Sequence, residues 1–285
     1  MWNRSIPTVL SIFCGTGVVV ASSIFHGAIC DKNEIILEGK LLSDRKYELQ
    51  KAQRLSSNDA QLMEIHRFPK HMSHDDIQEI LEFEKKNKGS VGVSRRDGNG
   101  VKRMDGTWGT SYLSTNGLFQ REKGNLLAKL LDAAKTADSY HNWGLLNGSQ
   151  EDFHIRVIEC HTVEKGGSLR DVHHCDQGSL VTIDVMCSQD SEFTGGIFST
   201  LESSGNLQRH LFKYGDVIVF PSHKYHCIEP VTSGTRRVLV VELWEGKDRF
   251  CAHRCDDPAG DCKYSILHNQ MDMMVKCSFP EIDPW

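Results

Sequence analysis

The sequence predicts a mainly β fold with flanking helices, preceded by an N-terminal segment long enough to cross a membrane. Residues 6–30 contain no Lys, Arg, Asp or Glu, and 15 of these 25 residues are apolar. Between residues 74 and 134, apolar side chains recur at helical spacing. Beyond residue 153, short β-branched segments are separated by Gly, Pro, Asn or Ser. This change in period, from about 3.6 residues to 2, indicates helices followed by antiparallel strands.

The composition is that of a folded chain. Its 285 residues are 39% hydrophobic and 25% charged, which is enough to bury a core in one or two domains. The 33 basic and 38 acidic residues give a formal charge of -5, so the chain lacks the basic excess of a nucleic-acid-binding protein. The 14 histidines and 10 cysteines supply material for metal sites or disulfides.

Residues 1–30 are interpreted as a cytosolic tip followed by a signal-anchor. Arg4 precedes the apolar run and acidic residues follow it, so the positive-inside rule places the bulk of the chain in the lumen. The small residues Ala21, Ser22 and Ser23 leave a cleaved signal peptide as the alternative. We therefore expect a single-pass protein of the endoplasmic reticulum or Golgi membrane, or else a secreted one. The sequon at Asn147 would be used in either case.

The remaining chain divides into a polar stem at 31–61, a folded domain at 62–250 and a Cys-containing tail at 251–285. Ser73 is the expected N-cap of a helix at 74–86, and apolar spacing predicts a second helix around 126–134. The Gly-rich basic stretch 88–106 is interpreted as a loop rather than an anion site. Strands are expected at 153–160, 180–187, 209–213, 216–220 and 236–244.

The sequence His-x-Asp occurs twice. In an extended segment, His174 and Asp176 would face the same side and could bind one ion. The other copy, His74 to Asp76, falls in the first turn of the expected helix, where its carboxylates serve the cap and the helix dipole. We therefore assign that copy to structure. So short a motif arises readily by chance, so the copy at His174 is weak evidence when taken alone.

A second histidine, His226, strengthens the interpretation of His174 and Asp176 as metal ligands. His226 follows an expected strand and precedes a turn, and Arg236 comes ten residues later. Two histidines and one carboxylate form the facial set that binds non-haem Fe(II) and leaves coordination positions open. His223 competes for the distal position, but its spacing to the following turn and to Arg236 is less suitable. Arg236 could offer a bidentate fork to a carboxylate.

At these residues the chain resembles the prolyl 4-hydroxylase-like branch of the Fe(II)- and 2-oxoglutarate-dependent dioxygenases. The resemblance runs from about 155 to 246, and more loosely back to residue 62. Its matched pieces are His174-x-Asp176, the turn Phe193-Thr-Gly195-Gly196-Ile-Phe198, the stretch Tyr214-Gly215-Asp216 to Pro221, and His226-x-Ile-x-Pro230-Val231-x-x-Gly234-x-Arg236.

The resemblance implies a double-stranded β-helix, or jelly-roll, core. It implies iron held by His174, Asp176 and His226, with the distal carboxylate of 2-oxoglutarate paired to Arg236. The implied reaction consumes O2 and 2-oxoglutarate, releases carbon dioxide and succinate, and hydroxylates a C–H bond of a protein or peptide, with proline the first expectation. L-ascorbate would act as the accessory reductant.

The chain also departs from the family. Where the family commonly has a tyrosine that binds 2-oxoglutarate, this chain has Cys160 and His161, and a second tyrosine position falls near Met186. His161 could donate the same hydrogen bond or could be a core histidine, and the sequence does not decide between these alternatives.

The tail carries Cys251, Cys255, Cys262 and Cys277, which allow three disulfide pairings. His253 lies between the first two, so a zinc knuckle is conceivable. Disulfides are favoured because we expect the chain to be exported.

Two other classes of protein compete with this oxygenase. One is a catalytically silent jelly-roll binding module, which would have no need of three metal ligands and Arg236. The other is a cupin-like enzyme, which would be expected to carry His-x-His. A 2-oxoglutarate dioxygenase acting on a non-prolyl substrate stays open.

Overall fold

The computed structural model describes residues 13–14, 17–18, 57–97, 101–102, 104–146 and 153–255. The chain divides into two units, residues 1–41 and 42–285. In the first, β1 (Phe13–Cys14) pairs antiparallel with β2 (Gly17–Val18). The rest of the expected signal-anchor, the Asn147 sequon and the last two tail cysteines lie outside the described residues. Within the described ranges, no helix has both the length and the apolar character needed to span a bilayer.

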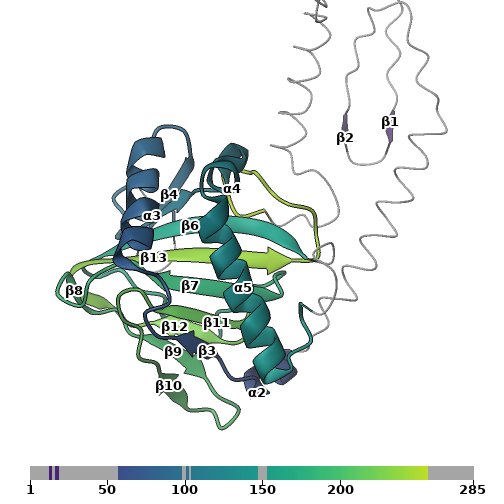
Figure 1. Ribbon diagram of the computed structural model, residues 1–285, viewed down its shortest axis with the longest axis vertical. Helices are drawn as coiled ribbons and strands as arrows, with labels where there is room; N and C mark the ends of the chain where they lie inside the picture. The colour runs from purple at the N-terminus through teal and green to yellow at the C-terminus, as the bar shows by residue number, and fades with distance from the viewer. Residues whose placement is uncertain are drawn as a thin grey trace, which may run out of the picture. The chain divides into compact units, whose positions relative to one another are not determined.

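The second unit is built on two antiparallel sheets (Figure 1). The large sheet has the strand order β3-β11-β7-β13-β6-β5-β4, with β8 also paired to β13, and the small sheet has the order β10-β9-β12. The strands of the large sheet are β3 (His66–Phe68), β4 (Gly92–Arg96), β5 (Trp108–Tyr112), β6 (His154–Glu164), β7 (Val181–Met186), β8 (Phe193–Gly195), β11 (Val217–Pro221) and β13 (Val231–Trp244). Those of the small sheet are β9 (Phe198–Leu201), β10 (Leu207–Arg209) and β12 (His226–Ile228).

Helices cover one face of the large sheet, and Figure 1 shows α5 lying across its strands. The helices are α2 (Ser57–Leu62), α3 (His74–Asn87), α4 (Leu118–Glu122) and α5 (Gly124–His141), with a 3-10 turn at Thr115–Gly117. Ile77 and Ile80 of α3 and Leu130 of α5 are fully buried and share one hydrophobic cluster with the inward residues of β6, β7 and β13. The two predicted helices are therefore confirmed.

The other face of the large sheet is available for a site, because side chains alternate along each strand. On β13, Leu239 and Val241 pack into the helix-side cluster, whereas Val238 and Val240 face the opposite side and line a cavity. On β7, Ile183 packs into the same helix-side cluster. The predicted mainly β fold with antiparallel sheets and flanking helices is confirmed, and its two-sheet arrangement is consistent with a jelly-roll.

Two sequence predictions were wrong. Residues 88–106, expected to be a loop, contain β4, which was missed because it is a polar strand whose described side chains are mostly exposed. The strand expected at 209–213 ends at Arg209, because β10 pairs only through residues 207–209 and the chain then turns toward Asp216. Neither segment carries the apolar alternation that marks a half-buried strand.

Candidate functional site

His174 and Asp176 lie in an irregular segment between β6 and β7, and His226 begins β12. Backbone hydrogen bonds hold these segments together. The His226 N–H donates to the His174 carbonyl at 2.9 Å, and the Asp176 N–H donates to the Ser222 carbonyl at 2.8 Å. Residues that are 52 positions apart in the sequence are therefore fixed side by side before any ligand is considered.

The three side chains converge. One ligand atom from each of His174, Asp176 and His226 lies within 4.8 Å of the others. The His174 Nε2 is 3.4 Å from Asp176 Oδ1, and the His226 Nε2 is 4.0 Å from Asp176 Oδ2. The two imidazole rings meet edge to face, with centroids 4.9 Å apart. Two imidazoles and one carboxylate at these separations suit an ion such as Fe(II), and with only three protein ligands they leave positions open.

Hydrogen bonds orient two of these side chains. The His226 Nδ1 lies 3.0 Å from the Lys224 carbonyl, which can only accept, so Nδ1 carries the proton and the Nε2 lone pair faces the cluster. The Thr182 hydroxyl donates to Asp176 Oδ2 at 2.7 Å. Both contacts restrain the ligand atoms in the way that supporting residues restrain metal ligands.

The electrostatics of the cluster keep it ready to bind a cation. Burial works to raise the pKa of Asp176, but His226 and His174 outweigh it and hold that pKa well below its ordinary value. Burial, together with the neighbouring His174, lowers the pKa of His226 in spite of Asp176. The carboxylate is therefore ionised and His226 is neutral near pH 7, which are the forms that ligate a metal.

The cluster opens into a cavity of about 350 Å³ on the face of the large sheet away from the helices. Strand register places its floor residues in rows. In one row His161 pairs with Val238, and in the next row Val240 pairs with Glu159 on one side and with Asp184 on the other. The metal-ligand cluster and these strand residues line one continuous space.

Arg236 lies in the same cavity and is 2% exposed. Its Nε and Nη2 atoms are buried and have no hydrogen-bond partner within the described part of the chain. Burial lowers the pKa of this guanidinium to about 10, so it stays charged at pH 7. A buried, charged group with unsatisfied donors is costly to leave unpaired, and a carboxylate would satisfy it with two hydrogen bonds.

The Gly195-Gly196 turn makes room for Arg236. Both glycines have positive φ, 76° and 61° respectively. A Cβ at Gly196 would lie 2.8 Å from the Arg236 Cδ, and one at Gly195 would lie 2.3 Å from the Pro230 carbonyl oxygen. The turn therefore needs glycine both for its backbone conformation and for close approach to the arginine.

His161 faces the cavity, but it already has a partner. Its Nε2 lies 2.6 Å from Glu159 Oε2, so a contact with 2-oxoglutarate would use its other nitrogen or break this pair. The competing His223 lies outside the group of converging ligand atoms. Two roles stay predictions, and the geometry places the residues for both around one cavity. They are metal ligation by His174, Asp176 and His226, and co-substrate binding by Arg236 and His161.

Sequence reasoning missed several ionisable groups of the cavity, among them Asp184. Its Oδ1 is buried without a hydrogen-bond partner among the described residues. Burial, with a contribution from Asp176, raises the pKa of Asp184 to about 7. The signal in the sequence was a single Asp inside the apolar segment 180–187, at a position that alternation places opposite the core.

A second missed group is an ion-pair network on the cavity wall. Glu242 is buried on β13 and accepts hydrogen bonds from Arg254 Nε at 2.7 Å and from Ser179 Oγ at 2.5 Å. Arg156 Nη1 lies 3.4 Å from the same carboxylate. This network connects the segment after β13 to the cavity wall. No short sequence motif predicts it.

No family model matches the chain, and no curated protein matches it. Among solved structures, it is similar to a prolyl-4-hydroxylase of Pseudomonas putida, with 14% identity over 66% of this chain and 96% of that one, and a TM-score of 0.45. It is also similar to a Trichoplax adhaerens prolyl hydroxylase solved with a hypoxia-inducible-factor peptide, with 14% identity over 70% and 93% of the chains and a TM-score of 0.46. A Burkholderia pseudomallei oxidoreductase of the 2OG-Fe(II) oxygenase family aligns at 10% identity over 74% and 93%, with a TM-score of 0.45.

Proposed function

We propose that the protein is an Fe(II)- and 2-oxoglutarate-dependent oxygenase that hydroxylates a side chain of a protein or peptide. The observation that carries the proposal is the buried guanidinium of Arg236. Two of its nitrogens have no hydrogen-bond partner in the described structure, and it shares a cavity with two imidazoles and a carboxylate. A binding module would gain nothing from an unpaired buried cation beside an open metal-ligand set.

His174, Asp176 and His226 would hold the iron from one side, and Thr182 and the Lys224 carbonyl would keep two of these ligands in orientation. When bound, iron would supply the activation of O2 that is coupled to oxidation of 2-oxoglutarate. The chain itself supplies position, because the metal ligands and Arg236 line one cavity.

Arg236 would bind the distal carboxylate of 2-oxoglutarate as a bidentate partner. Asp184 has the opposite sign and faces the same cavity, so as a carboxylate it would repel the co-substrate. Its pKa of about 7 means that it is mostly a neutral acid at slightly acidic pH, in which form it can donate a hydrogen bond to a bound carboxylate.

For the substrate, the motif resemblance makes a peptidyl proline the first candidate, with L-ascorbate as the accessory reductant. The apolar run at 6–30 supports retention of the enzyme in the endoplasmic reticulum or Golgi membrane, with its active site in the lumen.

One observation favours a non-prolyl substrate. Several side chains that line the cavity are charged, including Arg96, Asp97, Glu159 and Arg254. A substrate with a polar or charged side chain would complement such a wall better than a proline ring would. Prolyl peptides and peptides with acidic, amide or basic side chains should therefore be compared directly.

The decisive experiment measures succinate formed by the full-length protein with Fe(II), ascorbate and 2-oxoglutarate, with and without each peptide class. A second measurement titrates 2-oxoglutarate into the Ni(II)-loaded protein, in which no turnover occurs. We expect Arg236→Gln to weaken this binding strongly. Arg237→Gln is the matched control, because it changes the neighbouring arginine, which alternation places on the other face of β13. Absence of both succinate and 2-oxoglutarate binding in the wild type would contradict the proposal.

A further inference from the structure

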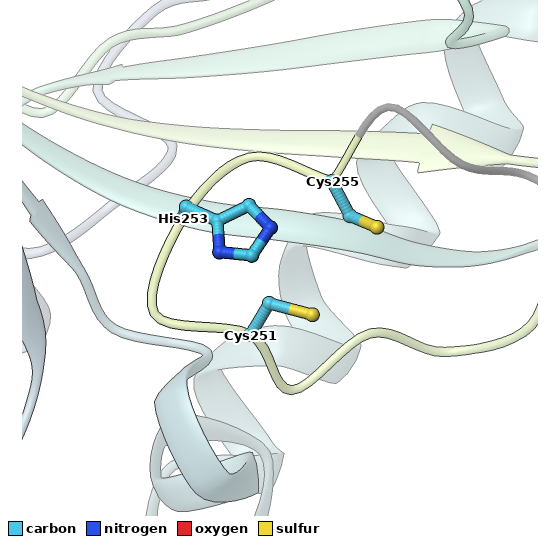
Figure 2. Close-up of side chains that lie close together, drawn as sticks. All are labelled: Cys251, His253 and Cys255. Atoms are coloured by element: carbon cyan, nitrogen blue, oxygen red, sulfur yellow. The ribbon is translucent and has the colours of Figure 1, made fainter. Parts of the chain in front are cut away.

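A second cluster of metal-binding side chains lies in the segment that follows β13. Cys251, His253 and Cys255 occupy alternate positions of one short loop, and one ligand atom from each lies within 4.8 Å of the others. Figure 2 shows the two thiol groups and the imidazole ring pointing into the concave side of this loop. The arrangement is independent of the cavity cluster and shares no residue with it.

These thiols differ from the packing cysteines of the domain. Cys160 and Cys187 are buried within the hydrophobic cluster between helices and sheet. Cys251 and Cys255 are buried as deeply, at 1% and 0% exposed, yet neither belongs to any hydrophobic cluster of the described residues. Two buried thiols whose sulfur atoms lie close to one imidazole nitrogen can act as metal ligands as well as packing groups.

The backbone holds the loop at several points. Arg156 Nε donates to the Cys255 carbonyl at 2.7 Å, the Arg249 N–H donates to the Ile155 carbonyl at 2.9 Å, and the Asn116 N–H donates to the Phe250 carbonyl at 2.9 Å. The ligand-bearing segment is therefore anchored at both ends. Such anchoring lowers the entropy cost of closing the three side chains around an ion.

We propose that Cys251, His253 and Cys255 supply three of the four ligands of a structural zinc ion. Zinc prefers thiolate and imidazole ligands, with bonds of about 2.3 Å to sulfur and about 2.0 Å to nitrogen. Ligand atoms that lie within 4.8 Å of one another need only a small contraction to share such an ion. The donor set also separates the two sites, because two soft thiolates favour zinc whereas His174, Asp176 and His226 favour Fe(II).

The zinc would position one wall of the cavity through Arg254. This residue stands between His253 and Cys255, and its side chain donates to Glu242 Oε1 at 2.7 Å and to the Gln177 carbonyl at 3.0 Å. Gln177 directly follows Asp176, and Arg254 itself lines the cavity. An ion bound by His253 and Cys255 would hold the backbone on both sides of Arg254 and so set the direction from which its side chain reaches the cavity.

The competing chemistry is a disulfide at Cys251 or Cys255, formed between them or with another cysteine of the tail, which the expected oxidising compartment would favour. Such a disulfide would use one or both of these sulfur atoms and leave His253 without a role in the cluster. The convergence of the imidazole on both thiols favours the metal.

The test uses the full-length protein purified under reducing conditions. The Asp176→Ala substitution first removes a ligand from the cavity cluster, so that metal bound in the cavity does not add to the measured number of zinc ions per chain. We expect about one tightly held zinc per chain in this background by elemental analysis. Replacing zinc with Co(II) should give the thiolate-to-metal charge-transfer absorption that the cavity ligands, which include no thiolate, cannot produce.

Adding Cys251→Ser and Cys255→Ser should remove both the zinc and the charge-transfer absorption. His253→Ala changes a partly exposed residue, leaves both thiols in place and should weaken zinc retention. Cys187→Ser is the matched control, because the hydroxyl can keep the bond to the Val185 carbonyl and zinc should stay bound. Each cysteine variant is also made without the Asp176 substitution. In these proteins, Ni(II) binding at the cavity cluster reports that the domain is folded.

Three results would overturn the proposal: no zinc in the Asp176→Ala protein, zinc retained in the folded double cysteine variant, or a disulfide at Cys251 or Cys255 found by mass spectrometry in the native protein. None of them depends on whether the cavity hydroxylates a substrate, so this test and that of the proposed function can fail separately.

Discussion

The same tripeptide pattern, His-x-Asp, occurs at two places and behaves differently at each. At His74 to Asp76 it forms the first turn of α3, where Asp76 accepts a hydrogen bond from the Ser73 N–H at 2.8 Å and lies 2.7 Å from Lys129 Nζ. At His174 to Asp176 it lies in an irregular segment, and its carboxylate meets two imidazoles. The Asp76 carboxylate is bound by the helix N-terminus and a lysine, whereas the Asp176 carboxylate faces the cavity together with the two imidazoles.

The difference shows that the environment of the carboxylate decides what the motif does. A carboxylate at a helix N-terminus satisfies backbone donors that would otherwise lack partners, so its lone pairs are used. Asp176 accepts a hydrogen bond from Thr182, and its carboxylate can still ligate an ion shared with His174 and His226. His74 points elsewhere as well, since its Nδ1 bonds the Tyr214 hydroxyl at 2.8 Å.

The largest expected effect is the loss of metal binding in Asp176→Ala. Removing this carboxylate leaves two imidazoles and no anionic ligand, so Fe(II) or Ni(II) binding at the cavity should be lost, together with succinate formation. The matched change, Asp76→Ala, should leave metal binding intact. Isothermal titration of Ni(II) into both variants checks the contrast, and equal affinities would show that the two motifs are not distinguished as we describe.

A smaller effect is expected from Thr182→Val, which keeps the shape of the side chain and removes the donor to Asp176 Oδ2. Loss of such a supporting hydrogen bond typically weakens metal affinity by about 10- to 100-fold. Titration with Ni(II) measures the change. If Thr182→Val binds as tightly as wild type, the hydroxyl does not hold the carboxylate in its ligating position.

At the helical copy, Ser73→Ala should lower the free energy of unfolding by about 1 kcal/mol, because it removes one half of the capping box. Metal affinity should be unchanged. Denaturant unfolding of the metal-free protein measures the loss, with the exposed helix residue Ser139→Ala as the control. A change in Ni(II) affinity on Ser73→Ala would couple the two regions and contradict their separation.

The smallest effect is a pH dependence at Asp76. Burial works to raise the pKa of Asp76, but hydrogen bonds from Lys129 and Ser73 outweigh it and lower that pKa. A lowered folded-state pKa stabilises the protein above the ordinary carboxyl pKa, and this contribution is lost as pH falls through the lowered value. Asp76→Asn should therefore lose less stability than wild type between pH 5 and pH 3, about 4 being the ordinary value. Identical acid unfolding curves would contradict this assignment.

Local patterns were enough to predict some of the molecule. The Ser73 cap, the apolar spacing of α5 and the short β-branched runs of β7, β11 and β13 all act between residues close in sequence, and the structure has these elements. The polar strand β4 was missed because its pairing with β5, rather than burial of its own side chains, holds it in place.

The candidate site divides in the same way. The sequence by itself determined which residue types are present: two histidines, a carboxylate and an arginine, at spacings that resemble one enzyme family. Only the tertiary structure decided that Asp176 is turned toward His226, that Arg236 is buried with unsatisfied donors, and that Asp184 faces the same cavity. It also gathered Cys251, His253 and Cys255, three residues whose sequence favoured disulfides. The physical reason is that burial and pairing depend on contacts between distant segments, which no local pattern records.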